Sequence, residues 1–109
     1  MIHKQPSSNP AKVVVRFELP PAIWADSVFL VGDFNQWNET SHPMLRGRDD
    51  STWSIVLELD RGRQYEFRYL VNGHEWHNDW KADDYAPNPY GGTNSVVSTR
   101  NVLLPEQLS

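Results

Sequence analysis

Residues 64–73 read QYEFRYLVNG and contain the clearest structural signal in the chain. Tyr65, Phe67, Tyr69 and Val71 recur at every second position and alternate with the polar residues Gln64, Glu66 and Arg68. Because successive side chains of a strand point to opposite faces of a sheet, this alternation predicts a strand buried on one face. Asn72-Gly73 follows directly and is typical of a type I′ turn, which needs two residues at positive φ. The segment therefore predicts a β-hairpin with residues 74–77 as its return arm.

Further strands are predicted before and after this hairpin. They are residues 13–19, 27–31, 53–59 and 95–99, with 101–104 completing the last strand or pair. Within 27–31, residues 28–31 (VFLV) are continuously apolar, which is typical of a central strand buried on both faces. Residues 78–93 are expected to be irregular, and at most one helical turn is expected near residues 21–24.

The spacing of these segments predicts an all-β protein. Short strands separated by turn signals every 8–12 residues or so are typical of an antiparallel sandwich or barrel, and we expect an immunoglobulin-like β-sandwich of about 6–8 antiparallel strands. Residues 12–104 form this single domain. Residues 1–11 are polar and rich in Pro, Ser and Asn, so they are predicted to be a flexible N-terminal lead-in, and residues 105–109 a C-terminal tail.

Composition and charge exclude several classes of protein. The 109-residue chain carries 10 Lys+Arg against 14 Asp+Glu, a net charge of −4, which argues against binding nucleic acid through its phosphates. No cysteine is present, so disulfides and thiolate chemistry are excluded. The apolar runs are far shorter than the roughly 20 residues that cross a membrane, and residues 1–6 contain no signal-peptide pattern. We expect a cytoplasmic domain that binds neither nucleic acid nor membrane.

Candidate catalytic groups lack a supporting context. The acidic pairs that could cleave a glycosidic bond are Asp49/Asp50, Asp83/Asp84 and Glu75/Asp79. Each lies in or beside a predicted turn without apolar neighbours, so we expect solvated loop acids. His74 and His77 with Asp79 are not expected to bind a metal, because positions i and i+3 of a strand point to opposite faces. We predict no enzyme activity, no metal and no cofactor.

The five tryptophans are more informative. Trp53 shares the inward register of its strand and is expected in the core. Trp24 either caps the end of the sandwich or contacts a ligand. Trp37 lies in a polar loop, and Trp76 lies between Glu75 and His77, so both rings are expected to contact a ligand. Trp80 is the weakest of these ligand candidates.

Exposed rings among neutral amides suit a neutral, polyhydroxylated ligand. The apolar face of a pyranose lies flat on an aromatic ring, and its hydroxyls pair with the donors and acceptors of Asn or Gln. If a sugar covers about 50–80 Å² of each ring, stacking contributes about 1–2 kcal/mol per ring. After the cost of association, the dissociation constant falls between about 10 μM and 1 mM.

The motifs and their order resemble those of a known family. They are residues 31–38 (VGDFNQWN), 44–45, 53–57, 64–73, 76–79 and 92–97. In this order they resemble carbohydrate-binding module family 48, the isoamylase N-terminal-like or early-set domain. The same domain forms the glycogen-binding part of the AMP-activated protein kinase β subunit. The resemblance covers about residues 12–104 and implies the early-set form of the immunoglobulin-like sandwich.

The resemblance also implies which residues bind sugar. Two tryptophans stack on an α-glucan in glycogen-binding members, and they resemble Trp37 and Trp76. Tyr90 resembles a residue that wedges into the curve of the glucan, and Asn94 resembles an Asn that hydrogen-bonds sugar hydroxyls. A Lys that contacts sugar in the family falls at Glu66.

Arg68 lies two residues beyond Glu66, on the same face of the strand, so its side chain is expected to reach the sugar that the family's Lys contacts. The leading hypothesis is therefore a non-catalytic module that binds an α-1,4-glucan polysaccharide, such as glycogen or starch, or a maltooligosaccharide. The alternative is a protein-interaction or scaffolding domain without sugar affinity, as in the N-terminal domains of α-amylase-family glycosidases, with a glycosidase or another protein as partner. A third hypothesis is a fragment of a glycosidase or a minimal hydrolase. The chain ends at Ser109, without the roughly 250 residues of a catalytic barrel, so we expect no enzyme.

Overall fold

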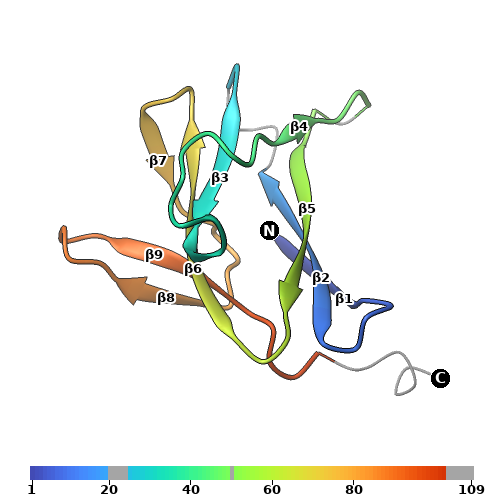
Figure 1. Ribbon diagram of the computed structural model, residues 1–109. Coiled ribbons are helices and arrows are strands. Elements are labelled where there is room, and N and C mark those ends of the chain that lie inside the picture. Colours follow the sequence, from blue (N-terminus) through green and yellow to red (C-terminus); the bar gives the residue numbers. More distant parts are fainter. Residues whose placement is uncertain (20–24, 50, 103–109) are drawn as a thin grey trace.

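Two antiparallel sheets face each other in the computed structural model, which describes residues 1–19, 25–49 and 51–102 (Figure 1). The β2 sheet has the order β1 (Ile2–Pro6), β2 (Lys12–Leu19), β5 (Trp53–Asp60), β4 (Leu45–Arg46). The β6 sheet has the order β3 (Val28–Gly32), β6 (Gln64–Val71), β9 (Thr93–Ser98), β8 (Asp84–Pro87), and β7 (Glu75–His77) also pairs with β6. A single 3-10 turn, η1 (Asp33–Asn35), follows β3. The predicted all-β, immunoglobulin-like sandwich is confirmed, and the described residues contain nine strands, against the expected 6–8.

The core lies between the sheets and is formed by the alternating apolar residues. Phe17 of β2 meets Phe67 of β6 edge to face, with 5.1 Å between ring centroids, and Phe67 meets Tyr69 in the same way at 5.6 Å. Trp53 is 8% exposed, so its assignment to the core is confirmed. β6 thus directs Tyr65, Phe67 and Tyr69 inward and leaves Glu66 and Arg68 on the outer face of its sheet.

β6 is the central strand of its sheet. It pairs with β3 along one edge, while its other edge pairs with β9 up to Phe67 and with β7 from Tyr69 onward. The predicted hairpin between β6 and β7 is confirmed, with Asn72 and Gly73 at φ of 55° and 77°. β6 therefore presents its outer side chains between three neighbouring strands.

Gly32, at the end of β3, lies unusually close to β6. A Cβ atom at this position would be 2.6 Å from the carbonyl oxygen of Glu66 and 2.8 Å from the Cβ of Phe67. Only glycine permits this approach, which sets the following η1 turn directly beside β6.

The prediction of a flexible lead-in over residues 1–11 is wrong. Residues Ile2–Pro6 form β1, which pairs along its length with β2. Ser7 is buried, and its hydroxyl donates to Glu58 Oε2 at 2.5 Å. Polar composition concealed this strand because an edge strand can leave many of its side chains in solvent.

The prediction of an irregular stretch over residues 78–93 is also wrong in part, because Asp84–Pro87 form β8 at the edge of the β6 sheet. This strand is too short to show an alternating pattern. A strand at 101–104 is not observed at residues 101 and 102, where Asn101 has a φ of 62°. Residues 103–109, Trp24 and the expected turn at 21–24 lie outside the described residues.

Asp79 is not the solvated loop acid that its sequence context predicts. Its side chain is fully buried and accepts a hydrogen bond from the Tyr69 hydroxyl at 2.7 Å. The amino group of Met1 forms an ion pair with the same carboxylate. These charged and hydroxyl partners compensate for the loss of water, so burial is possible despite the polar sequence around Asp79. Asp49, Glu75, Asp83 and Asp84 are exposed, as expected, and Asp50 lies outside the described residues.

Replacing Gly32 by Ala is expected to lower the free energy of unfolding by about 1–3 kcal/mol, because the added methyl group overlaps backbone and core atoms of β6. Urea unfolding monitored by circular dichroism measures this. Gly92→Ala is the matched control, because its Cβ would meet only the Asn88 side chain, at 3.3 Å. Equal losses in the two variants would contradict the role of the close approach.

Burial, followed by the neighbouring Asp79 carboxylate, raises the pKa of the Tyr69 hydroxyl well above its usual value. Since an unfolded Tyr loses its proton near pH 10, the free energy of unfolding falls as the pH rises above about 10. Tyr69→Phe is expected to be about 1–3 kcal/mol less stable at pH 7 and to lose less stability between about pH 9 and 11. Urea unfolding at each pH measures both effects, and parallel losses in the two proteins would refute the prediction.

Candidate functional site

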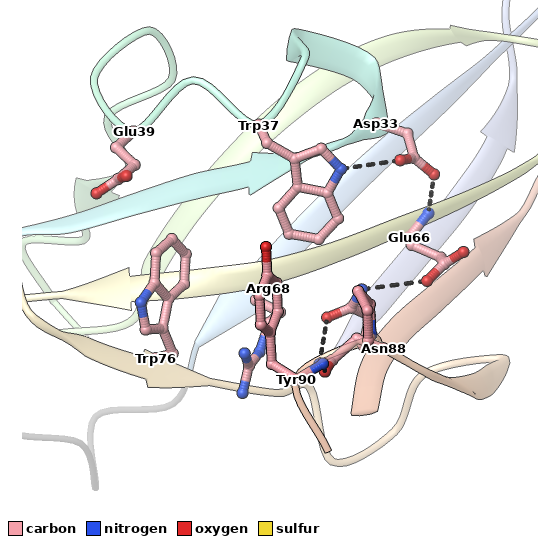
Figure 2. Close-up of a pocket in the computed structure, with 10 residues that line it drawn as sticks. Asp33, Trp37, Glu39, Glu66, Arg68, Trp76, Asn88 and Tyr90 are labelled. Carbon is pink, nitrogen blue, oxygen red and sulfur yellow. Dashed lines mark hydrogen bonds between the residues drawn. The ribbon is translucent and has the colours of Figure 1, made fainter. Parts of the chain in front are cut away.

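A groove with a volume of about 620 Å³ lies on the outer face of the β6 sheet (Figure 2). Its lining residues are Asp33, Trp37, Glu39, Glu66, Arg68, Trp76, Asn88, Pro89, Tyr90 and Asn94. The size is within the usual range for small-ligand sites, about 300–1,000 Å³. All five residues predicted to bind sugar, Trp37, Trp76, Tyr90, Asn94 and Arg68, lie together in this groove.

Trp37 is held in the loop after η1 by its backbone and by its ring. Gln36 and Trp37 both have positive φ, 54° and 58°, a conformation uncommon for residues other than glycine. The Trp37 N–H donates to the Gly32 carbonyl at 2.9 Å, which closes the loop. The ring is half-buried, and its Nε1 donates to Asp33 Oδ1 at 2.9 Å.

Asp33 joins this loop to β6. Its Oδ1 accepts from the Trp37 ring, and its Oδ2 accepts from the Glu66 backbone N–H at 2.7 Å. Figure 2 shows both bonds converging on the one carboxylate. Asp33 therefore fixes the orientation of the Trp37 ring relative to β6.

Trp76 projects from β7 and is 39% exposed. The guanidinium carbon of Arg68 lies 5.9 Å from its ring centroid, within the range of a cation–π interaction. Arg68 thus supports one face of Trp76 while lining the groove itself. Trp80 is 58% exposed but is not among the residues that line the groove.

Tyr90 is 94% exposed, on the loop between β8 and β9. The side-chain oxygen of Asn88 accepts from the backbone N–H groups of Tyr90, at 2.9 Å, and Gly92, at 3.1 Å, which shapes the loop around it. Gly91 has a φ of 87°, a conformation that glycine adopts without strain. The loop therefore holds a fully exposed ring beside the two tryptophans (Figure 2).

Asn94 lines the groove, and both polar atoms of its side-chain amide are hydrogen-bonded. Its Nδ2 donates to Glu66 Oε1 at 3.1 Å, and its Oδ1 accepts from Asn88 Nδ2 at 3.3 Å.

Asn35 lies two residues before Trp37, in the segment that the sequence indicates to be a polar loop, but it is only 7% exposed. Its side-chain oxygen accepts from the Gly32 N–H, and its amino group donates to the Leu30 carbonyl. It closes the η1 turn rather than facing a ligand.

Four lining residues were not predicted: Asp33, Glu39, Asn88 and Pro89. The sequence did contain a signal for Asp33. It follows the glycine that ends β3 and lies four residues before Trp37, in the same short loop segment. Asn88-Pro89 is a turn-forming pair in a stretch whose partners in space the sequence does not reveal. Asp33, Glu39 and Glu66 give the groove three carboxylates against one guanidinium.

The described part of the chain contains no group of three or more His, Cys, Asp or Glu side chains arranged to hold a metal. Within the same residues, no helix has the length and apolarity needed to span a membrane.

An aromatic groove on an immunoglobulin-like sandwich is typical of a carbohydrate-binding module, and the comparisons agree with this class. The family model of carbohydrate-binding module 48 (isoamylase N-terminal domain) matches residues 10–86. The chain belongs to this family. The expected family resemblance is therefore confirmed.

Curated proteins similar to this chain include 1,4-alpha-glucan branching enzymes. The enzyme GlgB of Novosphingobium aromaticivorans is 39% identical over 69 residues, which cover 60% of this chain and 9% of the enzyme. GlgB of Aquifex aeolicus is 42% identical over 57 residues, 48% of this chain and 9% of the enzyme. The branching enzyme of Dictyostelium discoideum is 58% identical over 33 residues, 30% of this chain and 5% of that enzyme. The similarity thus spans less than a tenth of each of these relatives.

Replacing Asp33 by Ala removes the acceptor of both the Trp37 ring and the Glu66 backbone. We expect a weaker near-ultraviolet circular dichroism signal from Trp37 and a free energy of unfolding lower by about 1–3 kcal/mol. Trp37→Phe identifies the part of the spectrum due to that ring. Asp26→Ala, which removes an exposed acid outside the groove, is the control, and an unchanged spectrum in Asp33→Ala would contradict the positioning role.

Proposed function

We propose that the groove binds an α-1,4-glucan by stacking glucose rings on Trp37 and Trp76. The observation that carries the proposal is the convergence of two tryptophans, an exposed tyrosine and an asparagine amide in one groove, although they come from four separate segments. The relatives suggest the ligand class, since they are 1,4-alpha-glucan branching enzymes.

The three rings supply most of the binding energy in this proposal. A glucose ring that covers part of an indole gains about 1–2 kcal/mol from the apolar area removed from water. Trp37 and Trp76 are each braced by a charged residue, Asp33 and Arg68, so little side-chain entropy is lost when sugar binds. Tyr90, on the loop between β8 and β9, contacts the same ligand with its ring and its hydroxyl.

Sugar hydroxyls are recognised by the polar groups between the rings. Asn94 Nδ2 has two hydrogens and uses one on Glu66, which leaves one donor for the ligand. Arg68 also lines the groove, and its guanidinium carries N–H donors for sugar hydroxyls. The dissociation constant expected for such a site is between about 10 μM and 1 mM.

The proposed role is binding without catalysis. Hydrolysis needs one acid to protonate the leaving group and a second carboxylate across the bond. Asp33 uses both of its oxygens to accept N–H groups, and Glu66 accepts from Asn94, so these carboxylates serve as fixed acceptors. A scaffolding domain without sugar affinity is the competing function, and the exposure of Trp76 and Tyr90 favours ligand contact over burial within the domain.

Affinity electrophoresis in gels containing glycogen or amylopectin tests the proposal. Wild type is expected to be retarded, and Trp37→Ala or Trp76→Ala is expected to raise the dissociation constant by about 5- to 30-fold, the equivalent of about 1–2 kcal/mol. Trp80→Ala is the matched control, because it removes an exposed tryptophan outside the groove.

Absence of retardation in wild type would refute glucan binding and favour the scaffolding function. Equal retardation of wild type and both groove variants would refute the assignment of the groove. New reducing ends after incubation of wild type with the glucan would refute the non-catalytic role.

A further inference from the structure

Glu66 is hydrogen-bonded to two other residues that line the groove, Asp33 and Asn94. Its backbone N–H donates to Asp33, which holds the Trp37 ring, and its carboxylate accepts from Asn94 Nδ2 at 3.1 Å. This is the position at which the family resemblance implied a Lys in contact with sugar. The hydrogen bonds around Glu66 indicate a different role for the acid in this chain.

The side-chain amides beside Glu66 form a chain of hydrogen bonds that runs in one direction. The backbone N–H groups of Tyr90 and Gly92 donate to Asn88 Oδ1, so the amino group of Asn88 must face the other way. That group donates to Asn94 Oδ1 at 3.3 Å, and Asn94 Nδ2 then donates to the Glu66 carboxylate. The chain of donors ends on the carboxylate.

The direction of this chain requires an acceptor at residue 66. A lysine ammonium is a donor only, so at this position it would attract the Asn94 oxygen and favour the opposite orientation of the amide. The amino groups of Asn94 and Asn88 would then face each other, donor against donor. An acceptor at residue 66 therefore keeps Asn94, Asn88 and the backbone around Tyr90 in one arrangement.

We propose that Glu66 is a positioning residue that orients the Asn94 amide and the Tyr90 loop for ligand binding, and that it does not substitute for a sugar-contacting cation. The inference rests on the proposed glucan function. It predicts that Glu66→Lys weakens binding, although this substitution introduces the residue that the family resemblance implies.

Isothermal titration with maltoheptaose separates the two roles. Glu66→Lys is expected to raise the dissociation constant by about fivefold or more, and Glu66→Gln, which keeps an oxygen acceptor, by no more than about threefold. Asp49→Lys is the control for charge alone, because it makes the same charge reversal at an exposed position that does not line the groove. Tighter or unchanged binding in Glu66→Lys would overturn the inference while leaving the glucan function intact.

A double-mutant cycle with Asn94→Ala tests whether Glu66 acts through Asn94. If it does, Glu66→Lys changes the dissociation constant by less than about twofold in the Asn94→Ala background. A fivefold effect that persists in this background would show that Glu66 acts by another route. Thermal unfolding of each variant separates loss of affinity from loss of fold.

Nuclear magnetic resonance of the side-chain amides tests the geometry without any ligand. The Asn94 and Asn88 amide protons are expected to be resolved and slow to exchange in wild type and Glu66→Gln, and to shift or broaden in Glu66→Lys. Unchanged amide resonances in Glu66→Lys would overturn the inference. If wild type shows this network but does not bind maltoheptaose, the glucan function fails while the positioning of Asn94 and Asn88 stands.

Discussion

The close approach of Gly32 to β6 is the constraint on which the rest of the site depends. Because no side chain separates Gly32 from the Glu66 carbonyl, the η1 turn follows immediately beside the strand. Asp33, the next residue, then reaches both the Glu66 N–H and the Trp37 ring. A wider separation of β3 and β6 would move the Trp37 ring away from the groove, so a packing requirement in the sheet also determines the shape of the groove.

β6 joins the core to the groove through its alternation. Phe67 and Tyr69 pack inward, and Tyr69 also donates to the buried Asp79 carboxylate, while Glu66 and Arg68 face outward. A change on one face therefore alters the other through the backbone. This arrangement lets a small sandwich with one core support the groove on its surface, because the strand that carries Glu66 and Arg68 is also anchored in the core by Phe67 and Tyr69.

The groove combines stacking surfaces with a polar network that sets their geometry. Asp33 and Arg68 each brace one tryptophan, and the amides of Asn88 and Asn94 connect the Tyr90 loop to Glu66. Glu66 stands at the position where the family resemblance implies a Lys. The hydrogen bonds show that the substituted residue is integrated into the network, so a changed residue at this position does not by itself indicate a lost site.

Sequence alone determined the all-β class, the strand–turn unit at 64–77 and the five candidate residues Trp37, Arg68, Trp76, Tyr90 and Asn94, because alternation, Asn-Gly turns and family motifs are local signals. Tertiary structure alone decided the strands β1 and β8, whose edge positions leave no strong pattern. It also decided the burial of Asp79 and the roles of Asp33 and Asn88 in the groove. These features depend on partners distant in sequence, and the free energy of burying a carboxylate or orienting an amide is set by those partners and not by its neighbours in the chain.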